Sequence, residues 1–305
     1  MIDFHCHLLP ALDDGPESVD ESLAMARALA EFGFREVHCT PHCIAGQYET
    51  SPVEVREAVR KLQARLDLEG IALTLRTGME YYLDECFERY AANLLPLGDS
   101  KLVLCEAPPQ APPALVSEMA SLIVVQGYIP LLAHPERSEP VWLLLEEQEA
   151  ENRAAGGRQK VRDPGTGTQE PEARSQSSVA MSHAPLAVSW WRRLFARAPR
   201  PVSDNLEPSD SAARHVSPSL PEDALFQVNL GSFTGFYGAQ PQRRAYDLLQ
   251  RGVYSCFASD LHDVRSAAPL LELAREKVEF NPAMKKLGTF IPPAGQGGND
   301  QLAFW

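Results

Sequence analysis

Strand-like segments alternate with helical segments along most of this chain of 305 residues. Short apolar, β-rich runs lie at residues 1–5, 36–40, 71–78, 101–106, 128–136, 225–231 and 253–260. Strands that alternate with helices favour a parallel sheet, and seven or so successive units favour a closed or nearly closed barrel. An open doubly wound sheet is the alternative, but its first strand is normally followed by a glycine-rich phosphate turn.

The helical segments carry their own start and stop signals. Ser18 and Glu21 have the spacing of a capping box, and Gly33 marks the stop of a helix over 18–33. Residues 51–70 repeat this pattern, with Ser51 as the cap and Pro52 at the first helical position. Further helices are predicted near 84–92 and over 113–126, 241–251 and 267–279.

Residues 147–222 interrupt the alternation. They are rich in Gly, Pro, Ser and charge without periodicity, which predicts a long disordered insertion. The insertion would divide the folded body into residues 1–146 and 223–287, and residues 288–305 would form a tail. Within it, "WWRRLF" is either an amphipathic segment that contacts a membrane surface through residues 188–197 or an apolar patch in a linker.

The composition restricts the class of partner and the compartment. The net charge of −13 disfavours nucleic acid as a partner, because phosphate backbones bind basic surfaces. We read no secretory signal and no transmembrane segment, and therefore expect a cytoplasmic protein with reduced cysteines.

The residues six positions after the six cysteines are Leu12, Ala45, Glu49, Ala92, Ala111 and His262. None is arginine, so no cysteine is followed by an arginine at the spacing with which a thiolate nucleophile and a guanidinium would enclose a phosphate.

Nine ionisable side chains lie just where the predicted strands end, on the rim where parallel barrels assemble their sites. Their types suit borderline or hard divalent ions such as Mn, Fe or Zn, and their number suggests two or three ions. Arg137 and Arg265 would bring positive charge to the same rim, although a surface ion pair is an equal reading for each. The nine predicted ligands are His5, His7, Asp14, His42, Glu80, Glu106, His134, Asp260 and His262.

The motifs "DFHCHLLPALDDGPES", "TPH", "TGMEYYL", "LAHPER" and "SDLHDVR" resemble the polymerase-and-histidinol-phosphatase (PHP) superfamily. Within it, the chain is most similar to the manganese-dependent bacterial protein-tyrosine phosphatases associated with capsule and exopolysaccharide synthesis. The resemblance implies a distorted (β/α)7 barrel that holds three metal ions. It assigns His5, His7, Glu80 and Asp260 to the first ion, Glu80, Glu106 and His134 to the second, and Asp14, His42 and His262 to the third. It also places Arg137 and Arg265 at positions that bind phosphate.

This resemblance implies hydrolysis of phosphotyrosine, with a membrane-associated bacterial tyrosine kinase as the protein substrate. Asp14 or a metal-bound water would then supply a proton to the leaving group. The alternative activity is that of a small-molecule phosphatase of the superfamily, such as a histidinol-phosphatase-like phosphoesterase. A non-catalytic metal-binding module is the third reading, and it would be marked by the loss of several ligands.

Overall fold

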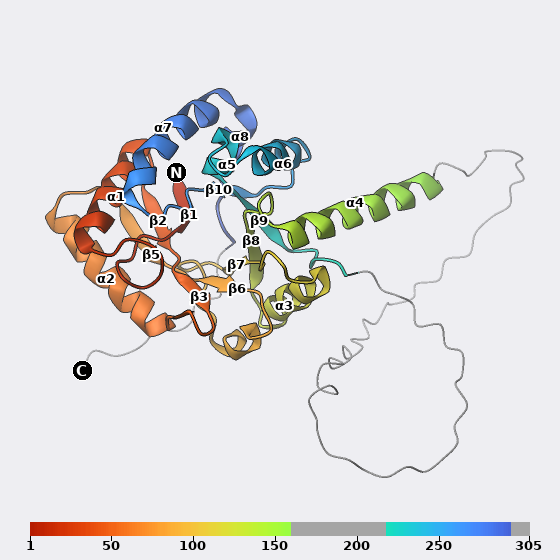
Figure 1. The fold of residues 1–305 in the computed structure, drawn as a ribbon, viewed down its shortest axis with the longest axis horizontal. Helices are drawn as coiled ribbons and strands as arrows, with labels where there is room; N and C mark the ends of the chain where they lie inside the picture. Colours follow the sequence, from red (N-terminus) through yellow and green to blue (C-terminus); the bar gives the residue numbers. More distant parts are fainter. Residues whose placement is uncertain (160–217, 294–305) are drawn as a thin grey trace, which may run out of the picture. The chain divides into compact units, whose positions relative to one another are not determined.

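The computed structural model describes residues 1–159 and 218–293. Strands lie at the centre of this part of the chain, and helices surround them (Figure 1). One sheet has the order β1 (Ile2–Cys6), β2 (Glu36–Cys39), β5 (Thr74–Thr77). The other has the order β10 (Cys256–Ala258), β9 (Leu225–Asn229), β8 (Ile129–Ala133), β7 (Leu102–Glu106), β6 (Glu80–Tyr82), β3 (His42–Ile44), β4 (Tyr48–Glu49).

The helices connect these strands in the alternating pattern that the sequence predicts. They are α1 (Val19–Phe32), α2 (Pro52–Leu68), α3 (Pro113–Val125), α4 (Glu139–Gln159), α5 (Leu230–Thr234), α6 (Ala239–Gln250), α7 (Val264–Phe280) and α8 (Pro282–Leu287). Among the helices of the described ranges, none combines the length and the apolar character needed to cross a membrane.

The strand order excludes the doubly wound alternative for the described sheets. All neighbouring strands pair in parallel except β3 and β4, and the parallel strands of both sheets follow the chain order. Only the edge strand β4, which pairs antiparallel with β3, departs from that order. A doubly wound sheet would reverse its strand order at a switch point. The fold is therefore a mixed α/β architecture of successive parallel units.

Hydrogen bonds join the two sheets at the carboxyl ends of their strands. The Asp260 N–H donates to the His5 carbonyl over 2.8 Å, and the His7 N–H donates to the Leu261 carbonyl over 3.0 Å. The buried Asp3 carboxylate accepts the Ser259 N–H over 2.9 Å. These bonds bring the end of β10 beside the end of β1, so residues from the two ends of the chain share one rim.

The helix signals in the sequence are largely confirmed. Ser51 and Glu54 form a reciprocal capping box at the start of α2. The Ser18 side chain accepts the Glu21 N–H at α1, but the Glu21 carboxylate accepts the Glu17 N–H instead of closing the box. Gly33 ends α1 in the left-handed conformation, at φ 119°.

The structure differs from the sequence-based elements in several places, and the short helices α5 and α8 are among the elements that were not predicted. The helix predicted near 84–92 is replaced by two short 3₁₀ turns, η1 (Phe87–Arg89) and η2 (Ala91–Asn93), which pack Phe87 and Ala91 into the core. Short strands β3, β4 and β6 were not predicted, because two or three residues carry too little periodicity. Helix α4 continues to Gln159, beyond the predicted start of the insertion at 147, while "WWRRLF" and the tail beyond 293 lie outside the described residues.

A small apolar cluster lies below the polar rim. On β7, Leu102 and Leu104 are on the same face as Glu106, because side chains alternate along a strand. Phe290, which follows α8, packs against this cluster and meets the Phe4 ring edge-on at 5.5 Å. The fully buried members are Phe4, Leu97, Leu102, Leu104, Leu131, Ala133 and Cys256.

Candidate metal centre

The structure brings all nine predicted ligands to one rim. Four overlapping groups of candidate metal-binding side chains are present, and together they contain every one of the nine. Most of these residues end or follow a strand, but His42 and Glu80 begin the short strands β3 and β6 and face each other in the ladder. The groups are His5–His7–Asp260, His5–Glu80–His134, His42–Glu80–Glu106 and His7–Asp14–His42–His262.

Backbone conformation contributes to this convergence. His134 and Asp260 follow β8 and β10 with positive φ angles of 32° and 51°. Side chains other than glycine rarely adopt this region, and such strained residues cluster at functional sites. The turns after β8 and β10 therefore place the side chains of His134 and Asp260 in the shared centre.

The deepest contacts surround the Nε2 atom of His5. His7 Nε2 lies 3.0 Å from it, and Glu80 Oε2 and Asp260 Oδ1 both lie at 3.1 Å. One ring nitrogen carries at most one proton, so a single hydrogen bond cannot explain three contacts of this length. Ligand atoms bound about 2.1 Å from one ion lie about 3.0–3.4 Å apart in octahedral or tetrahedral geometry. The spacing therefore suits donors that share a cation.

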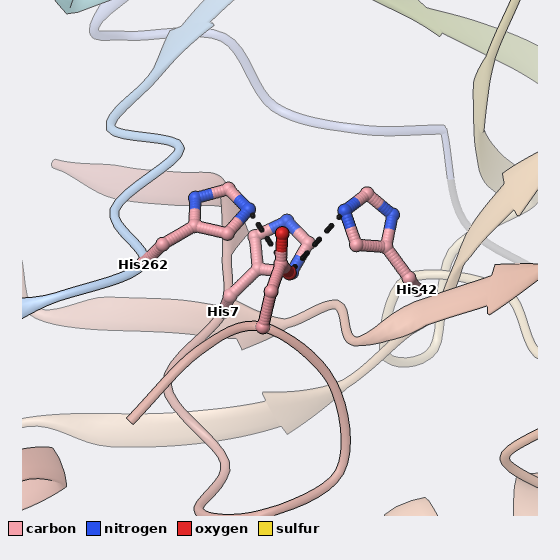
Figure 2. A group of neighbouring side chains, drawn as sticks. His7, His42 and His262 are labelled. Atoms are coloured by element: carbon pink, nitrogen blue, oxygen red, sulfur yellow. Dashed lines mark ion pairs between the residues drawn. The ribbon is translucent and has the colours of Figure 1, made fainter. Parts of the chain in front are cut away.

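Two further groups extend the centre toward solvent. Asp14 Oδ1 lies 3.5 Å from His42 Nε2 and 3.6 Å from His262 Nε2. Figure 2 shows these two imidazoles on either side of His7, and the His7 and His262 rings stack with centroids 3.8 Å apart. On the other side of Glu80, His134 Nε2 lies 3.5 Å from Glu80 Oε1 and 3.9 Å from Glu106 Oε1.

Glu80 is at the middle of this arrangement. It is 1% exposed, and neither of its oxygens accepts a well-directed hydrogen bond from the described residues. Nevertheless, His42 Nδ1 lies 3.0 Å from Oε2, and three other imidazoles lie within 3.5 Å of the carboxylate. A buried carboxylate without a hydrogen-bond donor is strongly destabilised unless a charge compensates it. Cations held between Glu80 and the imidazoles would supply that charge.

Three of the imidazoles are oriented by acceptors behind them. His5 Nδ1 lies 3.0 Å from Gln227 Oε1, His7 Nδ1 lies 2.6 Å from Asp13 Oδ2, and His262 Nδ1 lies 3.1 Å from the Asp260 carbonyl. Because these oxygens accept, each Nδ1 is the donor, and the Nε2 lone pair faces the centre. This is the arrangement of histidines that bind metals.

Sequence reasoning missed Asp13 and Gln227 in this role. Asp13 carried one signal, since it is adjacent to the predicted ligand Asp14. Gln227 carried none, because it lies within an ordinary apolar strand far along the chain.

The ionisation of the centre reflects a surplus of negative charge. Burial opposes protonation of His5, but Glu80 and Asp260 outweigh it and raise its pKa to about 9. Burial, together with the charge of Glu80, raises the pKa of Glu106 to about 8. Both the His5 imidazole and the Glu106 carboxyl therefore hold their protons more tightly than usual, because the centre lacks positive charge. Divalent cations would supply that charge and displace the protons, so the donor set fits such cations.

The three predicted catalytic residues lie at the edge of the centre. Arg137 is 31% exposed at its side chain and donates from NH1 to Asp260 Oδ2 over 2.7 Å. Asp14 is half-exposed at its side chain, and it lines a cavity of about 620 Å³ together with His262 and Arg265. Arg265 itself is exposed on the first turn of α7, and its N–H donates to Asp263.

The cysteines do not contribute to this centre. All six are free thiols, and only Cys86 is more than marginally exposed. Burial raises the pKa of the Cys43 thiol to about 12 and also raises those of Cys6, Cys39, Cys105 and Cys256. Thiols without thiolate character are poor nucleophiles, which agrees with the missing Cys-to-Arg spacing.

Comparison with known proteins supports the reading of the motifs. Residues 1–151 match the family model described as capsular polysaccharide synthesis, CpsB/CapC. The tyrosine-protein phosphatase YwqE of Bacillus subtilis is 40% identical over 143 residues, which are 46% of this chain and 56% of that protein. The tyrosine-protein phosphatase CpsB of Streptococcus pneumoniae is 32% identical over 141 residues, 45% of this chain and 57% of that protein. These alignments therefore span little more than half the length of the curated relatives.

The structural match extends over a larger part of the chain. A crystal structure described as one of YwqE from Bacillus subtilis and CpsB from Streptococcus pneumoniae, unique metal-dependent tyrosine phosphatases, aligns with a TM-score of 0.61. The alignment has 25% sequence identity and covers 97% of this chain and 100% of that one.

Proposed function

We propose that this chain, whose residues 1–151 match the CpsB/CapC family of capsular polysaccharide synthesis, is a metal-dependent protein-tyrosine phosphatase. The observation that carries the proposal is the buried Glu80 carboxylate, which accepts no well-directed hydrogen bond from the described residues but lies among four imidazoles. Relatives and a structural neighbour that are named as tyrosine phosphatases supply the substrate class.

We assign the nine side chains to three divalent ions, with manganese preferred and iron or zinc as alternatives. His5, His7, Glu80 and Asp260 would hold the first ion, and Asp14, His42 and His262 would hold the third. The second would take Glu80, Glu106 and His134, so Glu80 would belong to two of the three ligand sets. The contacts in the structure support this assignment, because each set contains pairs of atoms between 3.0 and 3.9 Å apart.

The bound ions would supply an activated water and polarise the phosphoryl oxygens. Arg137 would bind the phosphate through the guanidinium nitrogens that Asp260 does not use, and Arg265 would approach from the Asp14 side of the cavity. Tyrosine titrates near pH 10, so its oxygen leaves far more readily than a serine alkoxide. The half-exposed Asp14 is placed to return a proton to that oxygen.

We infer further that the two sheets form the distorted (β/α)7 barrel implied by the resemblance. The bonds from the Asp260 N–H to the His5 carbonyl and from the His7 N–H to the Leu261 carbonyl support this inference, because they link the two sheets at the rim. A closed barrel would place its active site at the carboxyl ends of the strands, where the nine side chains lie.

The protein substrate that we propose is the phosphorylated tail of a membrane-associated bacterial tyrosine kinase in the cytoplasm. Residues 188–197 would bring the enzyme to the membrane, although they lie outside the described residues. Deleting 160–217 tests this, since α4 is helical up to Gln159. Turnover of a soluble phosphopeptide should persist, while turnover of a kinase tail on anionic vesicles should fall. An equal fall in both activities would show that the segment is part of the fold.

The decisive experiment compares substrates on protein loaded with Mn²⁺. Hydrolysis of a phosphotyrosine peptide should exceed that of the same peptide with phosphoserine and that of histidinol phosphate. Exhaustive chelation should abolish the activity, and thiol alkylation should leave most of it. Preference for histidinol phosphate would favour the small-molecule phosphatase, and activity that survives metal removal would refute the metal-dependent mechanism.

A further inference from the structure

Arg137 is held between a carboxylate and an aromatic ring. Its NH1 donates to Asp260 Oδ2 over 2.7 Å, and its guanidinium carbon lies 4.0 Å from the centroid of the Tyr237 ring. Within residues 1–159 and 218–293, NH1 is the only guanidinium nitrogen of Arg137 that donates a hydrogen bond. The side chain is thus fixed from two sides, while most of its donors are free to bind a ligand.

From this geometry we infer that Tyr237 is a positioning residue, which holds the Arg137 guanidinium in the orientation that receives the substrate phosphate. The inference rests on the proposed function, because it takes Arg137 as a phosphate-binding group. A cation over an aromatic face is attracted by the ring quadrupole, and the flat ring also restricts rotation of the planar guanidinium. Asp260 alone fixes one nitrogen and leaves the plane free to turn.

The loop that carries Tyr237 is built to bring the ring close. Gly235 ends α5 in the left-handed conformation at φ 81°, and the chain then turns back over that helix. A Cβ atom at Gly231 would lie 2.7 Å from Tyr237 Cε2, so only glycine allows the ring to pack there. The absence of a side chain at Gly231 in α5 therefore permits the close packing of the Tyr237 ring.

Glu136 anchors helix α5, which precedes the loop of Tyr237. It is fully buried next to Arg137, and its carboxylate accepts the Asn229 N–H over 3.0 Å and the Ser232 hydroxyl over 2.7 Å. The "HPER" turn and the start of α5 are thereby locked together. A ring carried by the second element can then fix the orientation of an arginine carried by the first.

The ring rather than the hydroxyl carries this role. No hydrogen bond of the Tyr237 hydroxyl is present among the described residues, whereas Tyr246 donates to the Phe233 carbonyl over 3.4 Å. Tyr237→Phe should therefore preserve the effect, and Tyr237→Leu should remove it. Tyr246→Leu is the matched control, because it truncates another half-buried tyrosine packed on α5 without touching Arg137.

The test combines phosphatase kinetics with binding of inorganic phosphate to the Mn²⁺-loaded protein. For Tyr237→Leu we expect kcat/KM to fall about 5- to 30-fold, from a cation–π interaction of about 1–2 kcal/mol. The Kd for inorganic phosphate should rise, because the same guanidinium would bind the free anion. Tyr237→Phe should keep kcat/KM and the phosphate Kd within about twofold of the wild-type values. Tyr246→Leu should lower the melting temperature but leave kcat/KM and the phosphate Kd near the wild-type values.

A double-mutant cycle with Arg137→Lys identifies the path of the effect. If Tyr237 acts through the guanidinium, Tyr237→Leu should have little further effect in the Arg137→Lys background. Additive effects, or a Tyr237→Leu variant with unchanged kinetics and phosphate binding, would overturn the inference. If the wild-type protein does not hydrolyse phosphotyrosine at all, the proposed function is refuted. That outcome differs from a failure of the Tyr237 inference, in which the wild-type protein is active but the variants do not behave as expected.

Discussion

Replacing Asp13 with asparagine tests whether the residues behind the imidazoles set metal affinity. Asp13 Oδ2 accepts from His7 Nδ1 over 2.6 Å and from the His42 N–H over 3.0 Å, while Oδ1 accepts the Gly15 N–H over 3.0 Å. Asparagine has one acceptor oxygen and one donor nitrogen. Whichever way its amide turns, at least one of these three donors faces an NH₂ group.

The magnitude follows from which bond is lost. If the amide nitrogen faces His7, the ring loses the acceptor that directs its Nε2 toward Glu80, 3.3 Å away. Loss of such an acceptor typically reduces metal affinity about 10- to 100-fold. The opposite flip leaves the Gly15 N–H unpaired, which costs about 1–3 kcal/mol of stability at a partly buried site. We therefore expect weaker Mn²⁺ binding if the amide nitrogen faces His7, and a lower melting temperature if it faces the Gly15 N–H.

The assay is a chelator-competition titration with Mn²⁺, followed by kcat at saturating metal. Asp223→Asn is the matched control, because it makes the same charge change at an exposed position remote from the centre. Asp13→Asn should need about 10- to 100-fold more free Mn²⁺ for half-maximal activity, and excess metal should restore most of kcat. Metal affinity and stability both equal to those of the control would refute the reasoning.

Three further outcomes are expected. Glu80→Gln should remove most bound metal, measured by elemental analysis, and lower kcat/KM more than about 100-fold, because Glu80 contacts four imidazoles; metal content equal to wild type would contradict this. The His38 imidazole, 3.6 Å from the Glu36 carboxylate, and the Arg76 guanidinium, which donates to it over 3.0 Å, lower the pKa of Glu36 to about 2. Its stabilisation should be present above about pH 4.5 and disappear toward pH 2, so Glu36→Gln should lower the melting temperature at pH 6 but much less near pH 2. Phe4→Ala should cost about 3–5 kcal/mol of unfolding free energy in urea, because Phe4 is 2% exposed within the small apolar cluster; a loss below about 1 kcal/mol would show that the cluster repacks.

Local patterns in the sequence were sufficient for the main elements. The alternation of apolar runs and helical segments predicts β1, β2, β5, β7, β8, β9 and β10, because burial of one core imposes its period on each element separately. The caps of α1 and α2 are equally local, since a cap depends on residues three positions apart. Even the set of nine side chains could be named in advance, because the carboxyl ends of parallel strands share one edge.

Only the tertiary structure decided what stands behind and beside those side chains. Gln227 meets His5 across 222 positions of sequence, and Tyr237 reaches Arg137 because Gly231 leaves room for its ring. The helix predicted near 84–92 gave way to 3₁₀ turns because burying Phe87 and Ala91 mattered more than local helical propensity. Periodicity and capping are properties of neighbours in the chain, whereas orientation of a side chain depends on partners that only folding brings into contact.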